Sequence, residues 1–237
     1  MKKMILASTS TIFGSKYLEY LFPVIKNLYH ECNNIIFIPF ARPNGVSHDL
    51  YTKHVKATFN KIGLNISGIN ESNNSIDSIK KCDGIFIGGG NSFVLLDEIQ
   101  KNNLLIPLKN KIESGTPFLG TSAGSNICGS SIGTTNDMPI VYPSSLNGLC
   151  LVPFNINPHY IDPITGSKHM GESRETRIKE FHQFNNQLVV GLREGSYLEI
   201  TENNIILKGS YSAKIFKKNQ DPFEIDPSFN LNKLLLN

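Results

Sequence analysis

The sequence predicts an α/β fold, a doubly wound and mostly parallel sheet. Short apolar runs alternate with segments of helical periodicity through about residue 130, and turns rich in serine or glycine separate them. Crossover connections between parallel strands place helices on both faces of such a sheet. At 237 residues the chain can bury a substantial core, and we expect a single domain over residues 1–237.

The first elements read as strand, turn and helix. Residues 4–7 are a compact apolar run, and residues 15–29 carry apolar side chains at helical spacing despite Pro23. The same unit then repeats along the chain. The pattern predicts, in order, strand 35–40, helix 48–62, strand 64–69, helix 75–81, strand 84–87, helix 91–100, helix 104–113 and strand 117–119.

The pattern changes after residue 130. Polar loops at 134–139 and 155–160 precede a charged helix near 172–184. Four short apolar runs then predict added antiparallel strands near the C-terminus, at 188–192, 196–200, 204–208 and 213–216. Because ligands bind at the carboxyl edge of a parallel sheet, the polar loops are the place to look for function.

Composition narrows the classes of function. The charged fraction is 18%, and no apolar stretch approaches the roughly 18 residues of a membrane span. A formal charge of +3 with scattered lysines suggests no nucleic-acid partner. The four cysteines contain no C-x-x-C pair, which argues against a zinc site or a redox motif. We expect a cytoplasmic protein with no membrane contact, no metal and no cofactor.

The stretch Gly120-Thr-Ser-Ala-Gly124 has the G-x-S-x-G spacing of a nucleophile elbow. In that device a buried strand turns sharply into a helix, and small residues let the serine hydroxyl stand clear. Ser122 is therefore the candidate nucleophile. The alternative is a strand-to-helix turn in which Ser122 only caps the helix.

A serine nucleophile needs a histidine base and a group that orients the histidine. His159 follows Pro158 in a loop after an apolar stretch, and it is the candidate base; the alternative is a structural loop histidine. Asp137 lies in a loop stiffened by Pro139 and is the candidate carboxylate. Asp162 and Glu172 are rivals for that role, and Asp137 could instead be a turn former.

A glycine-rich turn, Gly88-Gly-Gly-Asn91, ends one strand and opens a helix. Its N–H groups could hold a negative oxygen, together with the N–H of Ala123 after the candidate nucleophile. Gly89, Gly90 and Ala123 are therefore the candidate oxyanion donors. A phosphate site is weakly supported because the stretch lacks both common phosphate-binding motifs, and a tight turn is the remaining alternative.

Five short motifs carry further information when they are taken together. They are Ile87-Gly-Gly-Gly-Asn-Ser-Phe93, Gly120-Thr-Ser-Ala-Gly124, Thr134-Thr-Asn-Asp-Met-Pro-Ile140, Ile156-Asn-Pro-His159 and Gly171-Glu-Ser-Arg-Glu-Thr-Arg177. This set resembles the motifs of the peptidase E, or α-aspartyl dipeptidase, family. The three candidate catalytic residues also lie too close in sequence for an α/β-hydrolase, which indicates another scaffold. The similarity spans most of the chain and is best up to about residue 195.

The resemblance implies a fold similar to class I glutamine amidotransferases, which is flavodoxin-like. It implies a serine peptidase that removes an N-terminal aspartate from dipeptides and some short peptides. It also implies a triad of Ser122, Asp137 and His159, with Arg174 binding the side-chain carboxylate of the substrate. A guanidinium suits that role because it meets a carboxylate in a two-point fork. Such an enzyme would act as a monomer or homodimer on small peptides.

Two other functions fit the sequence less well. One is a hydrolase of aspartate-rich polymer that resembles cyanophycinase. Those enzymes tend to be longer, and the stretches around Asp137 and His159 fit peptidase E better. The other is a binding protein for acidic peptides that has lost turnover, although all three candidate triad residues are present.

Overall fold

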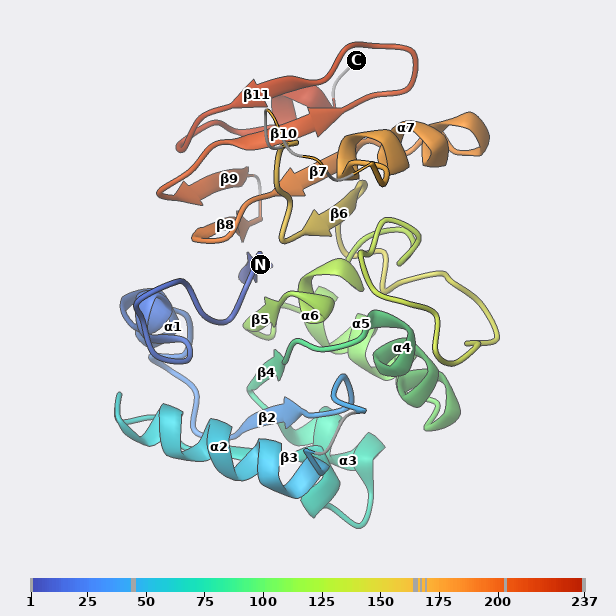
Figure 1. Ribbon diagram of the computed structural model, residues 1–237. Coiled ribbons are helices and arrows are strands. Elements are labelled where there is room, and N and C mark those ends of the chain that lie inside the picture. The colour runs from blue at the N-terminus through green and yellow to red at the C-terminus, as the bar shows by residue number, and fades with distance from the viewer. Residues whose placement is uncertain are drawn as a thin grey trace.

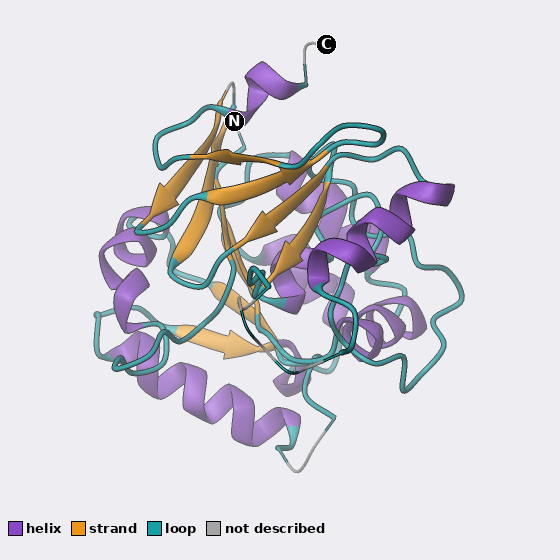
Figure 2. Ribbon diagram, turned by 45° about the horizontal axis from the view of Figure 1, so that its top comes forward, coloured by secondary structure: helices purple, strands orange, loops and turns teal. Residues whose placement is uncertain are grey.

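The strands of the protein form two sheets. The computed structural model describes residues 2–43, 46–163, 166, 168, 170–202 and 204–235. Its strands are β1 (Met4–Ala7), β2 (Ile35–Ile38), β3 (Ile66–Gly68), β4 (Gly84–Ile87), β5 (Phe118–Thr121), β6 (Asn155–Pro158), β7 (Val189–Leu192), β8 (Ser196–Thr201), β9 (Asn204–Gly209), β10 (Ala213–Phe216) and β11 (Phe223–Ile225). They form a seven-stranded sheet in the order β3-β2-β4-β5-β1-β8-β9 and a four-stranded sheet in the order β11-β10-β7-β6 (Figures 1 and 2).

The larger sheet confirms the predicted fold class. Its pairs from β3 through β2, β4 and β5 to β1 are all parallel. The strand β8 then pairs antiparallel with β1, and β9 pairs antiparallel with β8. The sheet is thus mostly parallel, with antiparallel strands added from the C-terminal part of the chain.

Helices cover both faces of the larger sheet. The α-helices are α1 (Phe22–Leu28), α2 (His48–Asn60), α3 (Ser75–Lys81), α4 (Ser92–Lys101), α5 (Leu105–Glu113), α6 (Ala123–Asn126) and α7 (Arg174–Phe184), and the 3-10 turns are η1 (Glu19–Leu21), η2 (Ile69–Glu71) and η3 (Leu231–Leu234). Figure 1 shows α1 and α2 on one side of the strands and α4, α5 and α6 on the other.

Side chains of each parallel strand alternate between the two cores. In β2, Ile35 and Phe37 pack with α1 and α2, whereas Ile36 and Ile38 join the core beneath α3 to α6. Successive strand residues point to opposite faces, so a strand with helices on both sides must be apolar throughout. This is why the parallel strands appear in the sequence as continuous apolar runs.

The first helix is shorter than the sequence predicts. The α-helix begins at Phe22 rather than near residue 15, and Pro23 lies in its first turn. Proline lacks the N–H that an interior helical residue needs, but the first turn leaves its N–H groups unpaired in any case. Upstream, Leu18 has a φ of 59°, which breaks helical geometry before η1.

The second sheet contains an element that the sequence does not reveal. Residues 155–158, predicted as part of a polar loop, form β6 and pair in parallel with β7. The strand β7 also pairs antiparallel with β10, and β10 with β11. The side-by-side carboxyl ends of β6 and β7 carry the residues described next.

No helix within the described residues is long and apolar enough to cross a membrane.

Candidate active site

The elbow around Ser122 forms because two glycines allow α6 to pack directly on the sheet. A Cβ on Gly120 would lie 2.5 Å from the carbonyl oxygen of Gly124, and a Cβ on Gly124 would lie 2.1 Å from that of Ile87. Any side chain at either position would therefore push the helix away from β4 and β5. The sequence spacing G-x-S-x-G is the consequence of this close approach.

Ser122 occupies a strained backbone conformation at this turn. Its φ is 54° and its ψ is −113°. Residues that carry a side chain rarely adopt this backbone conformation, which costs about 1–3 kcal/mol. Hydrogen bonds hold it there: its N–H donates to Ala7, and its carbonyl accepts from Ser125 and Asn126. This backbone conformation directs the Ser122 hydroxyl away from the sheet and toward the neighbouring loops.

The structure brings His159 to the Ser122 hydroxyl. His159 follows β6, and its Nε2 lies 2.8 Å from Ser122 Oγ. The other ring nitrogen, Nδ1, lies 2.6 Å from Oε1 of Glu194. An ionised carboxylate can only accept, so Nδ1 carries the ring proton and Nε2 is left to accept the serine proton. Ser122, His159 and Glu194 thus form a continuous chain of hydrogen bonds.

The sequence predicts Asp137 beside this ring, but the structure places its carboxylate elsewhere. Oδ2 of Asp137 accepts from the N–H of Ser92 at 2.7 Å and from the Thr135 hydroxyl at 2.8 Å. Ser92 is the first residue of α4, where backbone N–H groups lack helical partners and attract an anion. Within the described residues, Asp137 makes no hydrogen bond to His159, and its contacts anchor the 134–139 loop to α4.

Glu194 could not be identified from the sequence, because its place beside His159 depends on the pairing of β6 with β7. It lies two residues beyond β7, and His159 lies directly beyond β6. Parallel neighbours end at the same edge of a sheet, so the two side chains meet although 35 positions separate them. The sequence does show that Glu194 follows an apolar strand, which is a position typical of site residues. It does not show that β6 is the neighbouring strand, because residues 155–158 resemble a loop.

Ser8 links the two segments that carry His159 and Glu194. Its buried hydroxyl accepts from the N–H of His159 at 2.8 Å and donates to the carbonyl of Leu192 at 2.7 Å. Ser8 follows β1, which lies between β5 and β8 in the larger sheet. One hydroxyl therefore fixes the ends of β6 and β7 relative to the strand beside the elbow.

A cluster of charged residues fixes the segments that flank the ring. Arg193 pairs with Asp162 and Glu224, and Lys214 pairs with Asp162 and Glu175. Burial alone would raise the pKa of Asp162, but hydrogen bonds from Arg193 and Lys214 outweigh it and leave this pKa lowered. Asp162, a rival for the third site residue in the sequence, is thus committed to these cations.

The Gly88–Gly90 loop lies against the elbow. A Cβ on Gly89 would lie 2.9 Å from Cβ of Ser122, so only glycine lets the loop approach this closely. Within the described part of the chain, the N–H groups of Gly89 and Gly90 have no acceptor. Ala123 is the first residue of α6, and its N–H precedes the helical bonding pattern. These three donors can serve a negative oxygen near Ser122 Oγ.

Arg174 is a half-buried cation whose charge is only partly balanced by the described residues around it. It opens α7, and its Nη1 is buried without a hydrogen-bond partner among the described residues. Burial lowers its pKa, and the nearby charge of Glu194 acts in the opposite direction. The structure shows no ion pair from Arg174 to a described acidic residue, and Glu175 instead pairs with Lys179 and Lys214. The guanidinium therefore has hydrogen-bonding capacity that no described residue uses.

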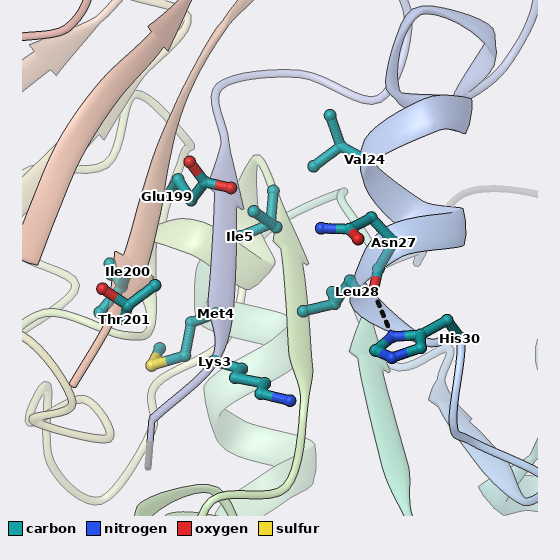
Figure 3. Close-up of a pocket in the computed structure, with 10 residues that line it drawn as sticks. All are labelled: Lys3, Met4, Ile5, Val24, Asn27, Leu28, His30, Glu199, Ile200 and Thr201. Atoms are coloured by element: carbon teal, nitrogen blue, oxygen red, sulfur yellow. Dashed lines mark hydrogen bonds between the residues drawn. The ribbon is translucent and has the colours of Figure 1, made fainter.

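A separate groove of about 190 Å³ lies far from this site (Figure 3). It is lined by the start of β1, by α1 and by β8, with Val24, Leu28 and Ile200 among its apolar residues. Its His30 is already engaged, because Nδ1 lies 2.8 Å from the carbonyl oxygen of Asn27. The groove is at the amino end of β1, whereas Ser122 is beyond the carboxyl end of its parallel neighbour β5.

Comparison with known proteins points to one family. The sequence matches Peptidase family S51 over residues 4–208. A Drosophila melanogaster protein named "Probable alpha-aspartyl dipeptidase" is 38% identical over 237 residues, 99% of this chain and 98% of that protein. Peptidase E of Streptomyces coelicolor is 38% identical over 232 residues, 98% of this chain and 94% of its own length. A solved peptidase from an acI-B1 Actinobacterium has a TM-score of 0.73 over 97% of this chain and 96% of its own, and at 14% identity this likeness concerns the fold.

The unpaired Arg174 predicts an unusual result for stability. Arg174→Met should leave the free energy of unfolding unchanged or raise it by about 0.5–1 kcal/mol, because it removes a desolvated charge and keeps much of the side-chain volume. Urea denaturation monitored by circular dichroism measures the difference. Arg177→Met, at an exposed position of the same helix, is the control and should change stability by less than about 0.5 kcal/mol. A marked loss with Arg174→Met would mean that the guanidinium has a structural partner.

Proposed function

Because the chain belongs to peptidase family S51, we propose that it is a serine dipeptidase that removes an N-terminal aspartate from dipeptides and short peptides. Its membership confirms the resemblance to peptidase E that the sequence motifs indicate. The observation that carries the proposal is the hydrogen-bonded chain from Ser122 through His159 to Glu194. A serine on a strained elbow, a base and an oriented carboxylate are the parts of acyl-transfer chemistry.

The first half of the reaction forms an acyl-enzyme. His159 Nε2 takes the proton of Ser122 as Oγ attacks the carbonyl carbon of the N-terminal aspartate. Glu194 stabilises the imidazolium and keeps Nδ1 protonated. The N–H groups of Gly90 and Ala123, with Gly89 beside them, hold the oxyanion. His159 then gives its proton to the leaving amine, and the peptide bond breaks.

The second half returns the enzyme to its starting state. His159 takes a proton from water, the hydroxide attacks the ester, and Ser122 leaves as its hydroxyl recovers the proton. Water can reach the ring because the His159 and Glu194 side chains are 33% and 50% exposed. The products are aspartate and the shortened peptide.

Arg174 is the proposed receptor for the aspartate side chain. It forms no ion pair with a described carboxylate, and the charge of Glu194 is close enough to influence its pKa. A substrate carboxylate would form an ion pair with the Arg174 guanidinium and so offset the cost of its partial burial. A neutral first residue would leave the charge uncompensated, so specificity follows from the unpaired state.

The Ser122→Ala variant tests the nucleophile. We expect kcat on Asp-Leu to fall by roughly 10⁵-fold or more, since no acyl-enzyme can form, with the fold intact by circular dichroism. A serine-directed phosphonate should label the wild-type protein at Ser122 and leave the variant unlabelled. Near-normal hydrolysis by Ser122→Ala would refute the serine mechanism.

Glu194→Gln and Asp137→Asn form a matched pair that separates the two candidate carboxylates. Glu194→Gln should lower kcat by about 10⁴-fold, because the amide can donate to Nδ1 and favours the wrong tautomer. Asp137→Asn retains an oxygen for the Ser92 N–H and should lower kcat by less than about tenfold. Steady-state kinetics on Asp-Leu distinguish the two, and the reverse order of effects would restore Asp137 to the triad.

A further inference from the structure

The segment after β2, residues 41–42, forms hydrogen bonds with the Gly88–Gly90 loop and Asn91 beside Ser122. The N–H of Asn91 donates to the carbonyl of Ala41 at 2.6 Å, and Nε of Arg42 donates to the carbonyl of Gly89 at 3.4 Å. Between these contacts, a Cβ on Gly90 would lie 2.0 Å from the Ala41 carbonyl oxygen. The two segments therefore meet backbone to backbone, and glycine at position 90 is a steric requirement.

A buried phenol reaches the same carbonyl from α2. The hydroxyl of Tyr51 donates to the Gly89 carbonyl at 3.3 Å, and the residue is only 2% exposed. Its ring and that of Phe37 pack edge to face, with the centroids 4.9 Å apart, and the Arg42 guanidinium lies over the Tyr51 ring, 4.7 Å from the centroid. These contacts and its burial hold the Tyr51 ring in place. The Tyr51 hydroxyl also lies 3.3 Å from that of Tyr17. Because the Gly89 carbonyl can only accept, Tyr51 gives its one hydrogen to Gly89 and accepts from Tyr17.

The carbonyl of Gly89 and the N–H of Gly90 belong to one peptide unit. In a trans peptide these two bonds point in opposite directions. A unit flanked by two glycines can turn over at little steric cost, so the backbone alone does not decide which way it faces. Donors on the Gly89 carbonyl therefore set the direction of the Gly90 N–H.

We propose that Arg42 and Tyr51 are positioning residues that hold the Gly89–Gly90 peptide unit with its N–H turned toward the oxyanion. The proposal rests on the acyl-transfer function proposed above. Donation to an amide carbonyl also polarises the amide and strengthens its N–H as a donor, and the charge of Arg42 adds to this effect. The two residues act through the peptide unit and do not touch the substrate.

A positioning role of this kind acts on the transition state. The oxyanion exists fully only in the tetrahedral intermediate, so loss of the donor lowers kcat and leaves ground-state binding unchanged. A merely structural contact would instead affect folding stability. The two donors share one acceptor, so either alone can hold the unit in part, and removing both should cost more than the two single changes predict.

The test compares Tyr51→Phe, Arg42→Met and the double variant on Asp-Leu. We expect each single variant to lower kcat by about threefold to fivefold with KM within twofold, and the double variant to lose about 10²-fold, the effect of one oxyanion donor. Tyr29→Phe is the matched control: its buried phenol donates to the carbonyl of Ile85 at 2.6 Å, away from the loop. That control should lose stability and keep kcat.

A second readout separates positioning from damage to the fold. An aminoalkyl boronic acid with the aspartate side chain mimics the tetrahedral intermediate, and its affinity should fall in parallel with kcat. The affinity for the product aspartate should stay within twofold. Unchanged kcat and boronate affinity in the double variant, or equal losses for boronate and aspartate, would overturn the proposal. Failure of the acyl-transfer function is distinguishable, because wild-type protein would then neither hydrolyse Asp-Leu nor bind the boronate covalently at Ser122.

Discussion

The hydrogen-bonded chain from Ser122 through His159 to Glu194 depends on the meeting of two sheets at one edge. Ser122 stands beyond β5 of the larger sheet, and the other two residues stand beyond β6 and β7 of the smaller one. The hydroxyl of Ser8, just past β1, bonds the backbone of both β6 and β7 at that edge. The proposed chemistry therefore depends on the packing of the two sheets as much as on the elbow, since a small shift between the sheets would separate His159 from the Ser122 hydroxyl.

Several costs to stability are concentrated around this edge. Ser122 and His159 both have positive φ values, and Arg174 buries one guanidinium nitrogen that has no hydrogen-bond partner among the described residues. Each of these features is unfavourable for the stability of the free protein, and each belongs to a residue with a role in the proposed reaction. The apolar parallel strands, buried on both faces, supply the rigidity that keeps such features in place.

The parts of the molecule that could be predicted from sequence are those encoded locally. Apolar runs and helical periodicity give the parallel sheet, and the elbow spacing identifies Ser122 because two glycines make close contacts that no other residue allows. Glu194 could not be found in this way, because it reaches His159 only through the pairing of β6 with β7. Asp137 lies between Ser122 and His159 in the sequence, but its carboxylate accepts from the N–H of Ser92 at the start of α4. The role of the 41–42 segment likewise emerges only when β2 and β4 lie side by side.

The most direct test of the proposed function is the ratio of kcat/KM for Asp-Leu to kcat/KM for Asn-Leu, measured for the wild-type protein and for Arg174→Met. The two dipeptides are nearly identical in shape and differ in the charge that Arg174 would receive. We expect the wild-type protein to favour Asp-Leu by at least about 10²-fold, and the variant to lose most of that preference while Asn-Leu hydrolysis changes little. A wild-type protein that cleaves both alike, or a preference that survives Arg174→Met, would contradict the assignment of this site to N-terminal aspartate.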